Sequence, residues 1–177
     1  WAGTRAGGLV RWDTASGAYT QRLRPQDPLA GNTVYDIALD AAGRKWLATD
    51  GGLTMLDDRG TADAADDTWR SYTHAGSHGG VPGDDLHAVA VSGNLVWVGG
   101  QQVWNPDTEA WEGGGLGLLD TKGTVETSDD VWAPVGTFAG TLREGTDGSR
   151  LLGLVSDNIT DIVVTAQGNL WIATVPH

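Results

Sequence analysis

Short runs in which apolar and polar residues alternate recur along the chain, and each run ends in a glycine-containing turn followed by a tryptophan. Alternation with a period of two is typical of half-buried strands, and a tight turn between two such runs predicts an antiparallel hairpin. Three hairpins of nearly equal length are expected, with turns at Gly43, Gly93 and Gly168. They read VYDIALDAAGRKW from Val34, LHAVAVSGNLVW from Leu86 and ITDIVVTAQGNLW from Ile159.

The tryptophan that closes each hairpin belongs to a second recurring string. The four copies are WAGT (1–4), WLAT (46–49), WVGG (97–100) and WIAT (171–174). Three copies continue to Gly-Gly-Leu and then to an aspartate four residues after the leucine. The first two intervals between the tryptophans are close to the roughly 40 to 50 residues of a four-stranded propeller blade, and the third is longer. The strands of one such blade are A (34–39), B (45–49), C (53–56) and D (68–72).

These repeats predict an all-β fold, a β-propeller built of four-stranded antiparallel blades. One such sheet cannot bury both faces, so the tryptophan and leucine of each blade are expected to pack against neighbouring blades. The strand order B-C-D, A-B-C-D, A-B-C-D, A-B makes about three and a half blades, and propellers typically close with about 4 to 8. We therefore expect one propeller segment, which the remainder of the same chain completes. Its repeats are 1–31, 32–84, 85–157 and 158–177.

Composition narrows the classes of partner. Glycine accounts for 27 of the 177 residues and tryptophan for nine, which suits short strands joined by tight turns. The formal net charge is −12, so nucleic acid, whose phosphates need clustered lysine and arginine, is not an expected partner. The absence of cysteine excludes disulfides and thiolate metal sites. No apolar run approaches the roughly 18 residues of a membrane span, so no membrane insertion is predicted for this segment.

The string NTVYDIALDAAGRKWLATDGGLTMLD, residues 32–57, resembles the two-component-regulator propeller repeat. Residues 158–174 match the first half of the pattern, and residues 1–13 match its second half. The third repeat departs from the pattern at Asp85, Ser92 and Gly100. In that family the repeats build propellers, commonly of seven blades, in extracytoplasmic sensor regions of bacterial hybrid histidine kinases and in other exported proteins.

The resemblance implies an extracytoplasmic bacterial module, periplasmic or at the cell surface or secreted, that binds a ligand or a protein. The motif residues are structural in the family, so no catalytic residue carries over. The residues themselves show no Ser-His-Asp order, phosphate-binding loop or paired-carboxylate motif.

The long insertions are expected mostly on one face of the propeller. If strand A is innermost, the B–C and D–A connections share that face, and insertions on one face of a repeat fold are typical of a binding surface. The insertions are 73–85, 99–115 and 136–157, and the candidate ligand-binding residues are Trp104, Trp111, His74, His78, Arg143 and Arg150. Trp104 and Trp111 would stack on a sugar ring or clamp a peptide. The alternative is that they form the small core of their own loop.

Other polar groups admit a structural and a functional interpretation. His74 and His78 lie in a glycine-rich segment, which favours a solvated turn over a metal site. The acidic loops 57–67 and 120–130 would either hold calcium or form a solvated surface, and neither matches the spaced D-x-D-x-D-G pattern. No other cofactor is predicted.

Asp36 and Asp161 occupy the same position of strand A in two repeats. They would either face the central channel or hydrogen-bond to the neighbouring blade, and the hydrogen bond is favoured.

Taken together, the sequence predicts a non-catalytic binding module for a carbohydrate, a peptide or other protein subunits. A structural component of an extracellular or cell-surface assembly is the alternative, since an acidic surface fits that role equally. A propeller lyase or hydrolase, with carboxylates gathered in the channel, is a third hypothesis.

Overall fold

The computed structural model describes residues 1–22, 29–61, 63–133, 143–144, 150–151, 154 and 156–176. Apart from the short 3-10 helix η1 (Ala64–Asp66), the regular elements of this part of the chain are strands. The strands are β1 (Ala2–Thr4), β2 (Gly8–Trp12), β3 (Tyr19–Arg22), β4 (Val34–Leu39), β5 (Lys45–Thr49), β6 (Gly52–Asp57), β7 (Thr68–Tyr72), β8 (Leu86–Ser92), β9 (Leu95–Asn105), β10 (Ala110–Asp120), β11 (Val131–Trp132), β12 (Arg143–Glu144), β13 (Arg150–Leu151), β14 (Ile159–Val164) and β15 (Leu170–Thr174).

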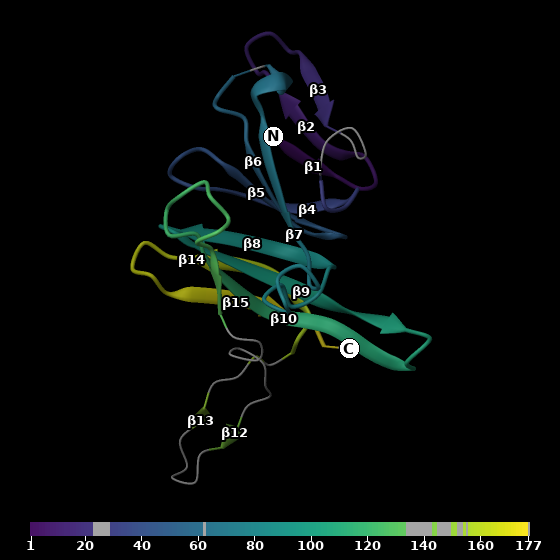
Figure 1. Cartoon of the computed structure of the whole chain (residues 1–177). Helices are drawn as coiled ribbons and strands as arrows, with labels where there is room; N and C mark the ends of the chain where they lie inside the picture. The colour runs from purple at the N-terminus through teal and green to yellow at the C-terminus, as the bar shows by residue number, and fades with distance from the viewer. Residues whose placement is uncertain are drawn as a thin grey trace.

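The strands form consecutive antiparallel sheets, one for each repeat (Figure 1). Their orders are β1-β2-β3, β4-β5-β6-β7, β8-β9-β10-β11 and β14-β15, and β12 pairs separately with β13. The predicted order B-C-D, A-B-C-D, A-B-C-D, A-B is therefore confirmed. We refer to these four sheets as blades 1 to 4.

The A strands of blades 2, 3 and 4 lie side by side, with β8 in contact with both β4 and β14. Each has an irregular register one residue after its start, where a bulge interrupts the ladder to strand B. Equivalent positions of the three repeats therefore have the same backbone geometry. Strand A is thus the strand through which neighbouring blades meet most closely.

Trp46 fills the space between blades 2 and 3. Its side chain is only 1% exposed and belongs to a core cluster with Leu86, Val96 and Leu119 of blade 3. Tyr72 of its own blade stacks on it with ring centroids 6.2 Å apart. The strand B tryptophan of one blade therefore packs against the strand C leucine of the next, as the repeat predicts.

The same arrangement is present at the preceding interface, between blades 1 and 2. Trp1 of blade 1 packs near Leu56 and Trp69 of blade 2. Among the described residues, no further sheet covers the equivalent residues on the outward faces of blades 1 and 4. Trp12 and Tyr19 of blade 1 are exposed and stack on each other, and Trp171 of blade 4 is 69% exposed.

The turn between strands B and C needs both of its glycines, for different reasons. Gly52 has φ +121°, a conformation that L side chains rarely adopt. At Gly51 a Cβ atom would lie 2.2 Å from the carbonyl oxygen of Ala30, so only glycine allows this close approach. The two glycines of the Gly-Gly-Leu string are therefore required by the backbone conformation of the turn and by a close backbone contact.

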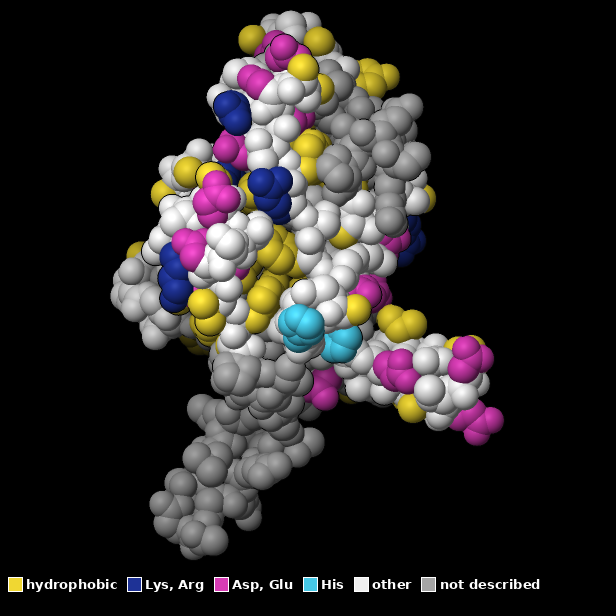
Figure 2. All heavy atoms as spheres, viewed as in Figure 1, with side chains coloured by type: hydrophobic (Ala, Val, Ile, Leu, Met, Phe, Trp, Pro, Cys, Tyr) yellow, Lys and Arg dark blue, Asp and Glu magenta, His cyan; other side chains and the backbone are white. Residues whose placement is uncertain are grey.

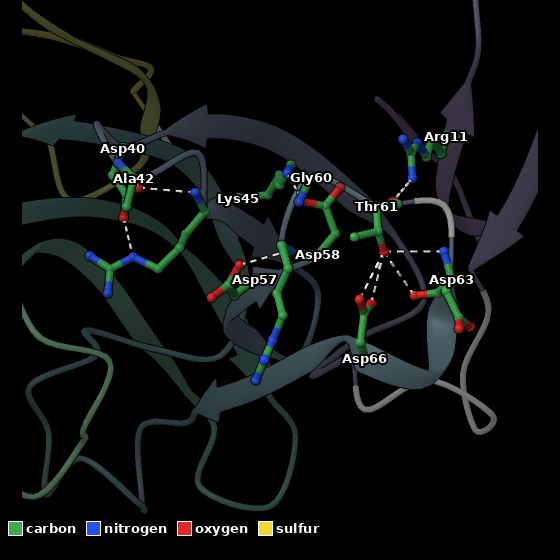
Figure 3. Close-up of polar contacts among 12 residues, drawn as sticks. Arg11, Asp40, Ala42, Lys45, Asp57, Asp58, Gly60, Thr61, Asp63 and Asp66 are labelled. Carbon is green, nitrogen blue, oxygen red and sulfur yellow. Dashed lines mark hydrogen bonds and ion pairs between the residues drawn. The ribbon is translucent and has the colours of Figure 1, made fainter.

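The acidic C–D loops of blades 2 and 3 each contain the same pattern of internal hydrogen bonds. Asp57 accepts from the N–H of Arg59 and Thr61 donates to Asp66, as Figure 3 shows for blade 2. In blade 3 the equivalent pairs are Asp120 with the N–H of Lys122 and Thr124 with Asp129. These carboxylates bond within their own loops, as expected for residues that set turns.

An arginine of the preceding blade binds each of these loops. Arg11 of blade 1 donates to the carbonyl oxygen of Thr61 (Figure 3). Arg44 of blade 2 donates to the carbonyl oxygen of Thr124 at 2.5 Å. The C–D loops therefore also connect the blades at this edge.

Candidate binding surface

The predicted loop at 99–115 is instead a long hairpin. Strands β9 and β10 each have 11 residues, and they remain paired from Leu95 with Asp120 to Asn105 with Ala110. Their distal part, residues 101–114, extends beyond the blade and is called the arm here; Figure 2 shows it projecting from the molecule. Glycine-rich sequence suggested a loop, but the ladder continues through it.

Trp104 and Trp111 lie directly opposite each other on the arm. Their ring centroids are 5.6 Å apart with the planes at 67°, an edge-to-face contact. The two side chains are nevertheless 47% and 52% exposed. The rings pack on each other, as the interpretation of a small core within the loop expects, and they still present apolar surface to solvent. Ligand binding by this pair stays a prediction.

The base of the arm is held by residues on two sides. The N–H of Gly115 donates to the carbonyl oxygen of Asp157 at 2.6 Å, and the N–H of Gln102 donates to Asn158 Oδ1 at 2.8 Å. On the other side, the N–H of Gln101 donates to the carbonyl oxygen of Asp85 at 2.9 Å. Gly113, Gly114 and Gly115 all have positive φ, so the glycines serve the approach of these neighbouring segments.

An open hollow of about 350 Å³ lies between the arm and the D–A connection of blade 2. It is therefore on the face that the sequence predicts for binding. The lining residues include Asp50, His74, Asp84, Asp85, Gln101, Val103 and Glu112.

The hollow has a negative electrostatic environment. Four carboxylates line it, and none of its described lining residues is lysine or arginine. Burial raises the pKa of nearby Tyr35, and the charges of Asp85 and Asp50 raise it further, whereas Arg5 opposes them. Hydrogen bonds from Asn105 and then Thr108 hold the pKa of Glu112 below its usual range. Glu112 is therefore ionised at neutral pH.

The two predicted histidines are separated by the structure. His74 lines the hollow, and its Nδ1 lies 2.7 Å from the carbonyl oxygen of Val81. That contact places the ring proton on Nδ1 and leaves Nε2 as the acceptor of the neutral ring. His78 lines a different hollow, beside Tyr72 and Asp130. His74 is thus the one of the pair that lies at the arm.

Arg143 and Arg150 lie on the short strands β12 and β13, where Glu144 pairs with Arg150. Their side chains are outside the part of the chain that the structure describes, as is most of the insertion 136–157. Within the described residues, no three His, Asp or Glu side chains are grouped in a way that would hold a metal ion. Calcium binding by the acidic loops stays a prediction.

Asp36 makes the inter-blade hydrogen bond that the sequence favours. Its Oδ2 accepts from the N–H of Val89 in blade 3 at 2.9 Å, and its Oδ1 accepts from Ile37 at 2.8 Å. Asp161 makes the equivalent local bond, with Oδ1 accepting from the N–H of Ile162 at 2.8 Å. In the part of the chain that the structure describes, no further strand A lies beside blade 4 to supply a second donor.

Replacing Asp36 with alanine is expected to lower the free energy of unfolding by about 1–3 kcal/mol, because the buried N–H of Val89 loses its acceptor. Asp161→Ala is the matched control and is expected to cost about 0.5–1 kcal/mol. Urea denaturation followed by tryptophan fluorescence measures both. Equal losses in the two variants would mean that the inter-blade bond does not form in solution.

Sequence reasoning missed most residues of the hollow, notably Asp50, Asp84, Asp85, Gln101 and Glu112. Their positions in the repeat are the only indication in the sequence: Asp50 directly follows the WLAT string, and Asp84 and Asp85 end the D–A insertion. The four carboxylates all lie in the B–C and D–A connections, whereas Gln101 carries no such signal. Their grouping depends on the arm, whose extent the pattern did not predict.

Residues 153–175 match the model of the family described as Two component regulator propeller. The chain contains a two component regulator propeller repeat. The matched residues are the copy that forms blade 4, and the resemblance predicted from residues 32–57 is thereby confirmed for the chain. No curated protein matches the sequence.

Two solved structures share the fold of this repeat protein. One is the extracellular domain of BT4673 from B. thetaiotaomicron, described as a one component system, with a TM-score of 0.58 and 17% identity over 97% of this chain. The other is PorZ, a surface component of the type-IX secretion system of Porphyromonas gingivalis, with a TM-score of 0.55 and 18% identity over 95% of this chain. The chain covers 20% and 22% of these two chains. In its own described residues, no helix has the length and apolar character needed to cross a bilayer.

Proposed function

We propose that the chain is part of an extracytoplasmic, non-catalytic propeller that binds a carbohydrate, a peptide or a protein at the arm. The observation that carries the proposal is the pair Trp104 and Trp111, which stays half exposed on a projecting hairpin next to the hollow. Covering the exposed parts of two such rings on binding would contribute about 1–3 kcal/mol for each.

The comparisons support the cellular context of this proposal. Two proteins with this fold are, by description, an extracellular domain and a bacterial surface component. The propeller repeat and the predicted resemblance to sensor regions agree with an extracytoplasmic position. In this proposal, further blades of the same protein cover the exposed faces of blades 1 and 4.

A scaffold role in a cell-surface assembly is the second candidate. It is favoured by the exposed aromatic residues on the outward faces, Trp12 and Tyr19 on blade 1 and Trp171 on blade 4. In this case other subunits, rather than a ligand, would cover those faces.

Binding of the protein to immobilised glycan and peptide arrays tests the first proposal. Trp104→Ala/Trp111→Ala is expected to reduce the signal of the bound probes roughly 30-fold or more, since aromatic anchors contribute about 2 kcal/mol or more at such sites. Trp12→Ala/Tyr19→Ala removes another exposed, stacked aromatic pair and is expected to leave binding unchanged. Loss of binding in the control alone would favour the scaffold role, and unchanged binding in the arm variant would refute the arm as the site.

A further inference from the structure

Among the described residues, no third strand pairs with the arm, which has exposed apolar side chains on both faces. Trp104 and Trp111 lie on one face, and Val103, which is also exposed, lies on the other face together with Glu112, because neighbouring residues of a strand alternate. A two-stranded ribbon on its own is marginal in water. Beyond the blade, neither β8 nor β11 pairs with it. These features point to a surface that a partner covers.

The charge of the arm selects the kind of partner. Residues 99–115 include Asp107, Glu109 and Glu112 and no lysine or arginine. Asp50, Asp84 and Asp85 face the same hollow as Val103 and Glu112. A second copy of this chain, with a net charge of −12, would meet the arm with like charge. A nucleic acid or an anionic lipid surface would be repelled for the same reason.

We propose that the arm docks an extended, basic segment of a partner protein, with lysine or arginine side chains entering the hollow. Such side chains combine an apolar stem with a cationic end. The stem would cover Val103, and the charge would lie among the carboxylates at the base of the arm. The pairing of β8 with β9 ends at Gly100, so an extended segment would add to the sheet along the distal part of β9.

This inference rests on the proposed function and names the partner for the same site. It depends on the carboxylates, whereas the proposed function depends on the tryptophans. The two can therefore fail separately, because different variants remove the two sets of side chains.

The test uses a fluorescein-labelled peptide of alternating arginine and threonine, nine residues long, and fluorescence anisotropy with the whole 177-residue chain. The matched probe replaces each arginine with glutamate. The expected result is saturable binding of the basic peptide that weakens with added salt, and no binding of the acidic one.

The test variant is Asp84→Asn/Asp85→Asn/Glu112→Gln, which keeps side-chain size and removes three charges. Its affinity is expected to fall about tenfold, from three partly exposed charge contacts. The control Asp57→Asn/Asp120→Asn/Glu126→Gln removes three charges from the C–D loops and is expected to change affinity less than about twofold. Thermal unfolding of both variants verifies that they fold.

Failure of the basic peptide to bind, or equal losses in the two triple variants, would overturn the inference. If Trp104→Ala/Trp111→Ala abolishes binding of neutral glycans while the basic peptide does not bind, the proposed function stands and this inference falls. If the peptide binds and only the carboxylate variant loses it, the inference stands and the tryptophans are not the anchors.

Discussion

Trp46→Ala is expected to lower the free energy of unfolding of the 177-residue chain by about 3–5 kcal/mol. The indole is 1% exposed, packs against strands of blade 3, and donates from Nε1 to Asp40 Oδ2 at 3.2 Å. Its loss leaves a cavity between two blades that the surrounding strands cannot close without breaking their ladders. Urea denaturation followed by circular dichroism at a β-sheet wavelength measures the change.

Trp171→Ala is the matched control, because Trp171 holds the same repeat position in blade 4 and is 69% exposed. Its replacement is expected to change stability by no more than about 0.5 kcal/mol, as at other surface positions. A large loss at both positions would show that the outward face of blade 4 is covered in solution. The slope of unfolding against urea should match in the wild type and both variants, which verifies that they unfold in the same manner.

Lys45→Met is expected to destabilise the fold by about 3–5 kcal/mol, because it leaves the carboxylate of Asp58 buried without its partner. The Lys45 ammonium donates to Asp58, and the two side chains are only 8% and 5% exposed. Lys45 also lies 5.5 Å from the ring centroid of Trp1, so the pair is part of the contact between blades 1 and 2.

Lys122→Met is the control for this pair. Lys122 also binds a carboxylate, that of Asp120, but the side chains are 46% and 32% exposed. Such pairs contribute about 0–1 kcal/mol, and the control should lose no more than that. The double variant Lys45→Met/Asp58→Leu is expected to recover most of the loss, because it removes both buried charges. A double variant as unstable as Lys45→Met would contradict this explanation.

The contribution of the pair Lys45 and Asp58 to stability depends on pH. Burial by itself raises the pKa of Asp58, but the hydrogen bonds from Lys45 and from the N–H of Gly60 outweigh it, so the pKa lies below the ordinary value of 3.8. A lowered folded-state pKa stabilises the fold above the unfolded-state value, and this stabilisation is lost as pH falls through the folded pKa. In Lys45→Met the burial remains and the hydrogen bond from Lys45 is gone. The difference in unfolding free energy between the two proteins should therefore shrink as pH falls below about 4, toward the lowered pKa of Asp58 in the wild type.

The strands of blades 2 and 4 follow from local sequence. Apolar and polar residues alternate over 34–39 and 159–164, and glycines follow at 43 and 168. Such a pattern favours a strand and a tight turn wherever it lies in a fold, because both depend on a residue and its near neighbours. The repeat then gave the inter-blade role of Trp46, since a sheet with two apolar faces must be covered on both.

The arm shows where local sequence misleads. Glycines 113–115 normally indicate a loop, yet here they lie within β10. They are needed because the backbone of residues 157 and 158 passes against the base of the arm, as the bonds to Gly115 and Gln102 show. That requirement arises from a segment some forty residues later, so no local pattern contains it.

Period-two patterning and the visible repeat predict the strands outside the arm, their order and the residues that face the next blade, because these features depend on a residue and its near neighbours. The folded structure adds three facts that no local pattern contains: Asp50, Asp84 and Glu112 border one hollow, Asp36 bonds to Val89, and Trp104 and Trp111 stay exposed. The hollow and the bond between Asp36 and Val89 join residues from different blades, and their distances follow from how the blades stack rather than from any spacing along the chain.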